Sequence, residues 1–160
     1  MVGIALGFLD DLAAAKEAPR KKSKPVEVLV NGNLYELVFY RADGDVWADS
    51  VARHPLRLDA VIDLKYGYNF NEVVLEIGST TSRYIEGGEE HAFPIDEVKD
   101  GEKPPIRPKS SAWESFFKSL SGSEVGKVTD AIWALNEWDP AQEIERAKKA
   151  LKAGSRRKSS

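Results

Sequence analysis

The sequence contains no cysteine, one methionine and only two histidines among its 160 residues. The lack of cysteine excludes disulfide bonds, thiolate metal ligands and a thiol nucleophile, and it is consistent with a reducing compartment. No nucleophile elbow, phosphate-binding glycine loop, dinucleotide fingerprint or zinc-ligand spacing is present. We therefore expect no catalytic residues, no metal and no cofactor.

Long apolar runs and a strong excess of one charge are also lacking. No apolar stretch approaches the roughly 20 residues needed to cross a bilayer. The apolar start is interrupted by Asp10 and Asp11 and follows no basic region, which argues against a signal peptide. Lys and Arg total 23 against 26 Asp and Glu, a net charge of −3. This balance does not favour a broad nucleic-acid-binding face, so we expect neither nucleic acid nor membrane as a partner.

The composition that remains is typical of a globular protein, with 42% hydrophobic and 31% charged residues. We predict an α+β fold that is mainly α-helical, with an N-terminal helix, one β-hairpin and then a helical bundle with a long loop. We divide the chain into a helical arm with a basic linker (1–25), a main domain (26–153) and a basic tail (154–160).

The N-terminal arm is predicted from apolar residues at helical spacing over 3–17. Prolines then bracket four cations and a serine in 18–25, which predicts a solvated linker that does not pack.

The strongest local pattern is a β-hairpin over 26–40. β-Forming residues at 26–30 and 33–40 flank Asn31-Gly32, a pair that suits a type I′ turn. The resulting register places Glu27 opposite Glu36. The opposite face then gathers Val26, Val28, Val30, Tyr35, Leu37 and Phe39.

Two helices are predicted after the hairpin, and the stretch 56–68 between them has no clear pattern. The first spans roughly 45–54 and ends before Pro55. Its inward side chains are expected to be Val46, Trp47 and Val51. The second spans about 69–80, with Asn69 as its N-cap. Its interior is expected to contain Phe70, Val73, Val74 and Ile77.

Residues 87–109 are rich in Gly, Pro and charge, which predicts a long mobile loop. Beyond it, Ser110 or Ser111 is expected to cap one helix and Ser121, with Glu124, the next. Asp139-Pro140 is expected to open a third helix and Gly154 to end it.

The two histidines are better explained by structure than by chemistry. His54 stands at a predicted helix end, where a capping or dipole role is expected. His91 lies in the predicted loop beside Glu89 and Glu90, whose paired carboxylates are expected to be solvated.

Five aromatic residues form the candidate partner-binding set. They are Trp113, Phe116, Phe117, Trp133 and Trp138. Helical spacing favours the core for the residues of the first helix, while a groove for a partner helix is the alternative. Trp138, at a helix junction, is the member expected to be exposed.

The order of motifs resembles a known family. A hairpin precedes Trp47 and a helix ending at His54-Pro55, and Tyr66-Gly-Tyr-Asn-Phe70 opens the next helix. A helix led by Trp113, another containing Leu135-Asn136 and a charged final helix follow. Over residues 26–153 this order resembles the tail assembly chaperones of long-tailed bacteriophages, particularly those infecting actinobacteria. The 87–109 loop has no counterpart in the family pattern.

The resemblance implies a role in phage tail morphogenesis. Family members bind the tape measure protein, keep it soluble, and help to recruit tail tube protein through a longer product of programmed frameshifting. This sequence would be the shorter product, acting in the host cytoplasm and absent from the mature virion. Self-association of the chain is a further possible contact. We expect helices within 111–153 to form part of the surface that binds the tape measure protein.

Two alternatives remain open at the sequence level. One is a small DNA-associated regulator with a helix-turn-helix at 111–137, assisted by the basic tracts 20–22 and 156–158. The other is a structural head- or tail-completion protein.

Overall fold

The structure is a computed structural model, and it describes residues 7–158. Its elements are, in order, α1 (Phe8–Glu17), β1 (Val26–Val30), β2 (Asn33–Phe39), α2 (Gly44–Arg53), α3 (Val61–Tyr66), α4 (Phe70–Thr81), β3 (Ser82–Glu86), β4 (Glu89–Ala92), α5 (Ser111–Ser119), α6 (Gly122–Trp133), the π-helical turn η1 (Ala134–Trp138) and α7 (Asp139–Lys158). The predicted α+β, mainly helical class is confirmed.

The first hairpin forms as predicted. β1 and β2 pair antiparallel with Glu27 opposite Glu36, and the turn residues Asn31 and Gly32 take the positive φ angles of 51° and 77°. The apolar face points into the core, where Val28, Leu37 and Phe39 are buried. The alternating pattern therefore fixed both the register and the buried face.

A second hairpin corrects the predicted loop. β3 and β4 are joined by Gly87 and Gly88, whose φ angles of 61° and 78° suit the tight turn. β3 also pairs with β2, so the sheet has four antiparallel strands in the order β1-β2-β3-β4. The prediction of a loop from residue 87 is wrong for the strand residues 89–92, and the long connection to α5 begins after them.

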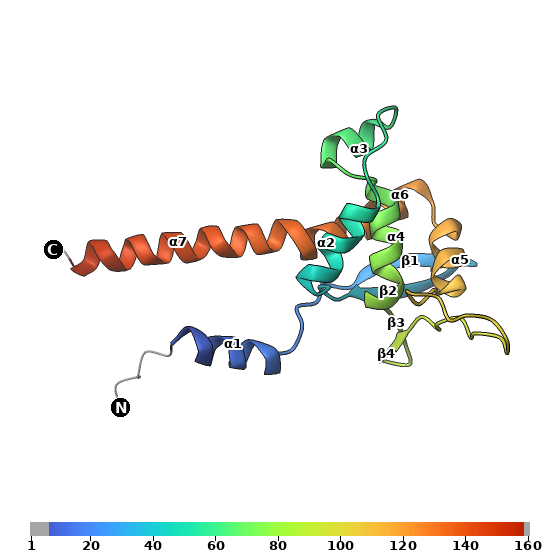
Figure 1. The fold of residues 1–160 in the computed structure, drawn as a ribbon, viewed down its shortest axis with the longest axis horizontal. Coiled ribbons are helices and arrows are strands. Elements are labelled where there is room, and N and C mark those ends of the chain that lie inside the picture. The colour runs from blue at the N-terminus through green and yellow to red at the C-terminus, as the bar shows by residue number, and fades with distance from the viewer. Residues whose placement is uncertain (1–6, 159–160) are drawn as a thin grey trace.

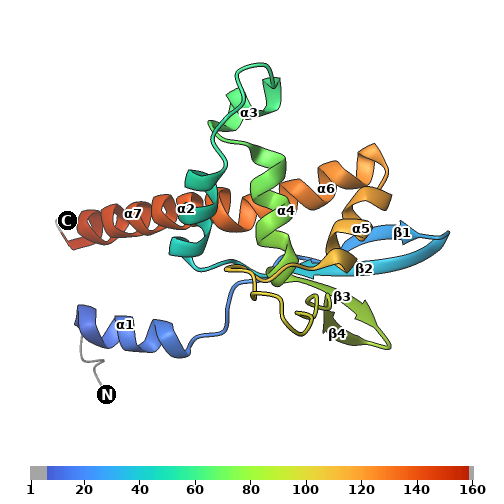
Figure 2. The ribbon, with the colours of Figure 1, turned by 45° about the vertical axis from the view of Figure 1, so that its right-hand side comes forward.

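The core lies between this sheet and the helices α4, α5 and α6, which cover one face of it (Figures 1 and 2). The predicted interior of α4 is confirmed, since Phe70, Val73, Val74 and Ile77 are all buried. The predicted caps also form: Asn69 accepts from the Glu72 backbone N–H, and Ser110 caps α5. Ser121 and Glu124 complete a capping box on α6.

Two details between the first hairpin and α4 differ from expectation. In α2, Trp47 is buried and Val51 half-buried, but Val46 points outward with 47% of its surface exposed. The unassigned stretch contains α3, a short helix stabilised by the buried carboxylate of Asp63. That carboxylate accepts a hydrogen bond from the Arg57 backbone N–H at 3.0 Å and forms an ion pair with its guanidinium.

The C-terminal helices form one continuous rod. α7 begins at Asp139, as predicted, but the prediction of a separate third helix is wrong, because α6, η1 and α7 follow without a break. Proline lacks the N–H that an α-helix interior uses. Directly before Pro140 the chain widens into the π turn, where the Asp139 N–H reaches back to Ala134 O. The predicted end at Gly154 is also wrong, because α7 continues to Lys158.

α1 and α7 project from the same side of the body (Figures 1 and 2). α1 confirms residues 8–17 of the predicted N-terminal helix, and residues 3–6 of that prediction lie outside the described residues. The linker is not merely solvated as predicted. Lys22 forms a β-bridge with Tyr40, and the Ser23 N–H donates to Phe39 O at 2.8 Å.

Candidate partner-binding surface

The structure divides the five predicted aromatic residues between two places. Trp113, Phe116 and Phe117 belong to α5, which packs beside the sheet, while Trp133 ends α6 and Trp138 ends η1. The two groups therefore do not form one surface.

Trp113 is a core residue and cannot contact a partner in this fold. It has no exposed surface, and its indole N–H donates to Leu75 O at 2.7 Å. Its ring lies directly against Gly78 of α4. The core interpretation, which the helical spacing favoured, holds here, and Trp113 leaves the candidate set.

Phe116 and Phe117 are half-buried beside Trp113. Phe116 lines a shallow apolar groove of about 270 Å³ between α5 and the sheet. The other residues of that groove are Val30, Tyr35, Leu37, Tyr84, Glu86 and Phe93. The Phe116 ring lies 5.4 Å from that of Phe93, so much of its surface contributes to the core edge rather than to an open face.

Trp133 and Trp138 form the more accessible site. They line an open groove of about 490 Å³, the aromatic groove, whose residues are Lys65, Tyr66, Asp130, Trp133, Ala134 and Trp138. Trp138 is 53% exposed, which agrees with its predicted exposure. Its ring centroid lies 6.1 Å from that of half-buried Trp133, so one indole supports the other.

The α3–α4 junction positions the opposite wall of the aromatic groove. Tyr66 stacks on Phe70 with ring centroids 4.0 Å apart and meets Trp133 edge-on at 5.5 Å. Gly67, with φ of 86°, ends α3 and turns the chain into α4. The Tyr68 hydroxyl donates to Glu137 of η1; burial, and then this hydrogen bond, raise the pKa of Tyr68 well above its ordinary value. Tyr66 was not included in the partner-binding set predicted from the sequence. The signal that could have indicated it is an aromatic residue directly before a glycine that ends a helix.

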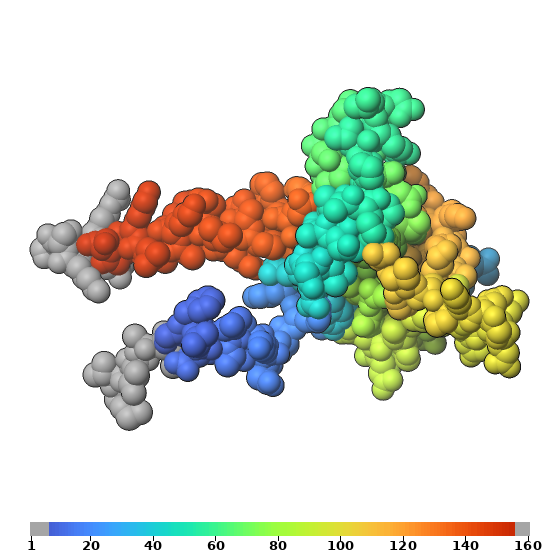
Figure 3. Space-filling model, viewed as in Figure 1, coloured from blue at the N-terminus to red at the C-terminus, as the bar shows by residue number. Residues whose placement is uncertain are grey.

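Three apolar side chains in and just before α3 are exposed. Leu58, Val61 and Leu64 are 84%, 82% and 55% exposed. In the space-filling view this segment projects from the upper end of the body (Figure 3). Lys65 and Tyr66 of α3 line the aromatic groove together with Trp138, so this segment and the groove are adjacent.

A cluster of charges lies away from this surface, at the end of α2. Glu76 of α4 forms ion pairs with Arg53 and His54, and Arg107 of the long connection reaches the same carboxylate at 3.9 Å. His54 also occupies the predicted capping position, as the C-cap of α2. Burial alone would raise the pKa of Glu76, but hydrogen bonds from Arg53 and His54 hold it below its ordinary value. These bonds join α2, α4 and the connection.

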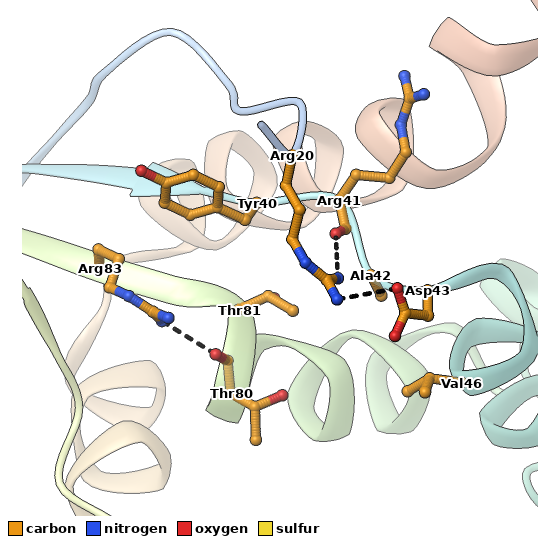
Figure 4. Close-up of a pocket in the computed structure, with 9 residues that line it drawn as sticks. All are labelled: Arg20, Tyr40, Arg41, Ala42, Asp43, Val46, Thr80, Thr81 and Arg83. Carbon is orange, nitrogen blue, oxygen red and sulfur yellow. Dashed lines mark hydrogen bonds and ion pairs between the residues drawn. The ribbon is translucent and has the colours of Figure 1, made fainter. Parts of the chain in front are cut away.

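A pocket of about 560 Å³ lies where the linker meets α2 and α4 (Figure 4). Its cations are already engaged: Arg20 pairs with Asp43 at 2.9 Å, and Arg83 donates to Thr80 O at 2.9 Å. The Thr81 hydroxyl donates to Ile77 O. These contacts hold the linker against α2 and β3 against α4.

The remaining predicted candidates are in β4 rather than in a loop. His91 stacks on Tyr84 at 5.3 Å, and Glu90 accepts hydrogen bonds from Tyr40 and Lys22. Within residues 7–158, no three His, Asp or Glu side chains are grouped so that they could hold a metal ion. In the same part of the chain, no helix combines the length and apolar character needed to cross a membrane.

Comparison with protein-family models, with curated proteins and with solved structures returned no match for this chain. The functional argument therefore depends on the chemistry of the surface.

Proposed function

We propose that this protein is a binding protein that captures an apolar helix of a partner chain on the aromatic groove and the adjoining α3. The observation that carries the proposal is the exposure of Trp138, whose ring lies tilted against that of Trp133 with centroids 6.1 Å apart. Tryptophan is among the residues most often found as an energetic anchor at protein interfaces.

The groove has the composition that an amphipathic helix recognises. Three of its six lining residues are aromatic, while Lys65 and Asp130 provide one charge of each sign. The exposed side chains of Val61 and Leu64 extend the apolar contact along α3. Apolar anchors of the partner would cover the indoles, and polar residues beside them would meet the two charges.

Within that proposal, the resemblance in motif order supports a tail assembly chaperone of a long-tailed phage. The partner is then the tape measure protein, a long helical protein whose apolar stripes need cover before assembly. Recruitment of the tail tube protein would use a longer frameshift product. The site of action would be the host cytoplasm, with the protein absent from the finished particle.

Co-expression with a tape measure protein tests this function. The Trp138→Ala, Val61→Ala double variant should lower the affinity for the partner at least about 30-fold, the loss expected when an interface anchor is removed. The readouts are the soluble fraction of the tape measure protein and the amount that copurifies. Leu34→Ala is the matched control, because Leu34 is 63% exposed and apolar but stands on the hairpin.

Unchanged capture by a folded double variant would refute the binding site. Detection of the protein in purified virions by mass spectrometry would instead support the structural head- or tail-completion alternative.

A further inference from the structure

α1 and α7 are two helices whose apolar side chains are left open. Phe8 and Leu9 of α1 are 78% and 75% exposed, and Ile144 and Leu151 of α7 are 58% and 75% exposed. α1 has no buried residue. Both views show the two helices side by side and running in opposite directions (Figures 1 and 2).

Such helices need a packing partner. A helix shorter than about 12–15 residues is marginal in water without tertiary contacts. α1 has 10 residues, and residues 144–155 of α7 are all exposed.

The apolar stripes of the two helices match. In α1, Phe8, Leu12 and Ala15 follow one another at spacings of four and three. In α7, Leu151, Ala147 and Ile144 repeat the same spacings when read backwards. Two stripes with this relationship interlock in an antiparallel pair of helices.

Their charges are also opposite. α1 carries three carboxylates against one lysine. The facing stretch of α7, residues 144–152, carries one carboxylate against four cations. An antiparallel pair brings the acidic first turn of α1 beside the basic part of α7, which stabilises the pair and also sets opposite helix dipoles side by side.

The bases of the two helices are fixed on one residue, Arg41. Its backbone N–H donates to Lys21 O at 2.9 Å, and its carbonyl accepts from Arg20 at 3.3 Å (Figure 4). Its guanidinium donates to Leu135 O at 2.7 Å and pairs with Glu143 at 3.0 Å. With both bases held in this way, α1 runs alongside its own α7 and yet buries none of its residues (Figure 3).

We propose that a second copy of this chain covers these stripes: α1 of each copy lies antiparallel on α7 of the other. The reciprocal exchange covers both helices of both chains with one self-complementary contact, as in a two-fold dimer. The inference does not depend on the identity of the captured partner, because it uses neither the aromatic groove nor α3.

Light scattering of the purified full chain tests the exchange. We expect a mass near twice the 17.7 kDa of one chain. Asp10→Lys plus Asp11→Lys should reduce the mass to that of one chain, and Lys148→Glu plus Lys149→Glu should do the same. An equal mixture of the two double variants should regain the doubled mass, because each reversed helix then meets a reversed partner.

Glu97→Lys plus Asp100→Lys is the matched control. It makes the same change in charge as the α1 variant, on exposed residues of the long connection, and should leave the doubled mass unchanged. If the wild-type protein has the mass of one chain at every concentration, the proposal is wrong. A monomer in which α1 packs on its own α7 would give this result. A mixture of the two double variants that remains monomeric would also overturn the proposal.

Discussion

At the scale of single residues, the contact between Gly78 and Trp113 decides how α4 and α5 pack. Trp113 is fully buried, and its indole occupies the space that a side chain at position 78 would need. A Cβ placed there would lie 2.8 Å from Trp113 Cε2, closer than real carbon contacts allow. Trp113 is itself held by its hydrogen bond to Leu75 O.

We therefore predict that Gly78→Ala destabilises the protein by about 1–3 kcal/mol, the usual cost of overpacking a core. The loss should outweigh the gain of roughly 1 kcal/mol that alanine brings to a helix interior. Urea unfolding followed by tryptophan fluorescence measures the difference.

Gly126 provides the control, because it lies in α6 with open space around its position. Gly126→Ala should raise the free energy of unfolding by about 0.5–1 kcal/mol. If both variants were stabilised, the proposed packing of Trp113 against α4 would be wrong.

The same contact shows what sequence could tell about the aromatic set. Helical spacing placed Trp113, Phe116 and Phe117 on one stripe. It could not show that only Trp113 would be fully buried, because that depends on the space that Gly78 of α4 leaves for its indole. Exposure of Trp138 was predictable from its position at a junction. Tyr66 was missed because its role depends on a stack with Phe70 and a contact with Trp133 across the fold.

At the scale of elements, prediction succeeded where one local pattern was sufficient. The Asn31-Gly32 turn fixed the first hairpin, and a cap with an apolar stripe fixed α4. The second hairpin has a two-residue turn as well, Gly87-Gly88, but the charged residues around it hide the alternation that identifies strands. β3 and β4 are defined by pairing with β2, a contact between segments distant in sequence.

The ion pairs of Glu76 hold α2, α4 and the long connection together, and they make the free energy of unfolding depend on pH. Hydrogen bonds from Arg53 and His54 outweigh burial and hold the pKa of Glu76 below the ordinary 4.5. A lowered pKa in the folded state means that the stabilisation is present above pH 4.5 and is lost as the pH falls through the folded value.

We predict that Glu76→Gln lowers the free energy of unfolding at pH 7, and that the difference from wild type shrinks as the pH falls below 4.5. Urea titrations across this range measure it. Glu97→Gln, at an exposed position on the long connection, removes one carboxylate without touching the cluster and serves as the control. A difference that stayed constant with pH would show that Glu76 acts through packing alone.

At the scale of the whole molecule, the chain is a body with two projecting helices. The body contains the buried side chains, whereas α7 beyond Glu143 has only exposed residues as far as the side chains are described. Folding of the body should therefore not need that part of α7.

We predict that a chain ending after Glu143 keeps a single cooperative urea transition and the near-ultraviolet circular dichroism of its buried Trp47 and Trp113. The truncation keeps both residues of the ion pair between Arg41 and Glu143. The truncated chain should also be monomeric in light scattering. Loss of the cooperative transition would show that the end of α7 belongs to the core.

The π turn before Pro140 has a geometric consequence for this architecture. Such a turn is equivalent to one extra residue inserted in an α-helix, and each residue of a helix rotates the next by about 100°. The insertion thus sets the angular phase between the face of α6 buried in the body and the apolar stripe of α7. A single-residue deletion within 134–138 would redirect that stripe while leaving every side chain along it unaltered.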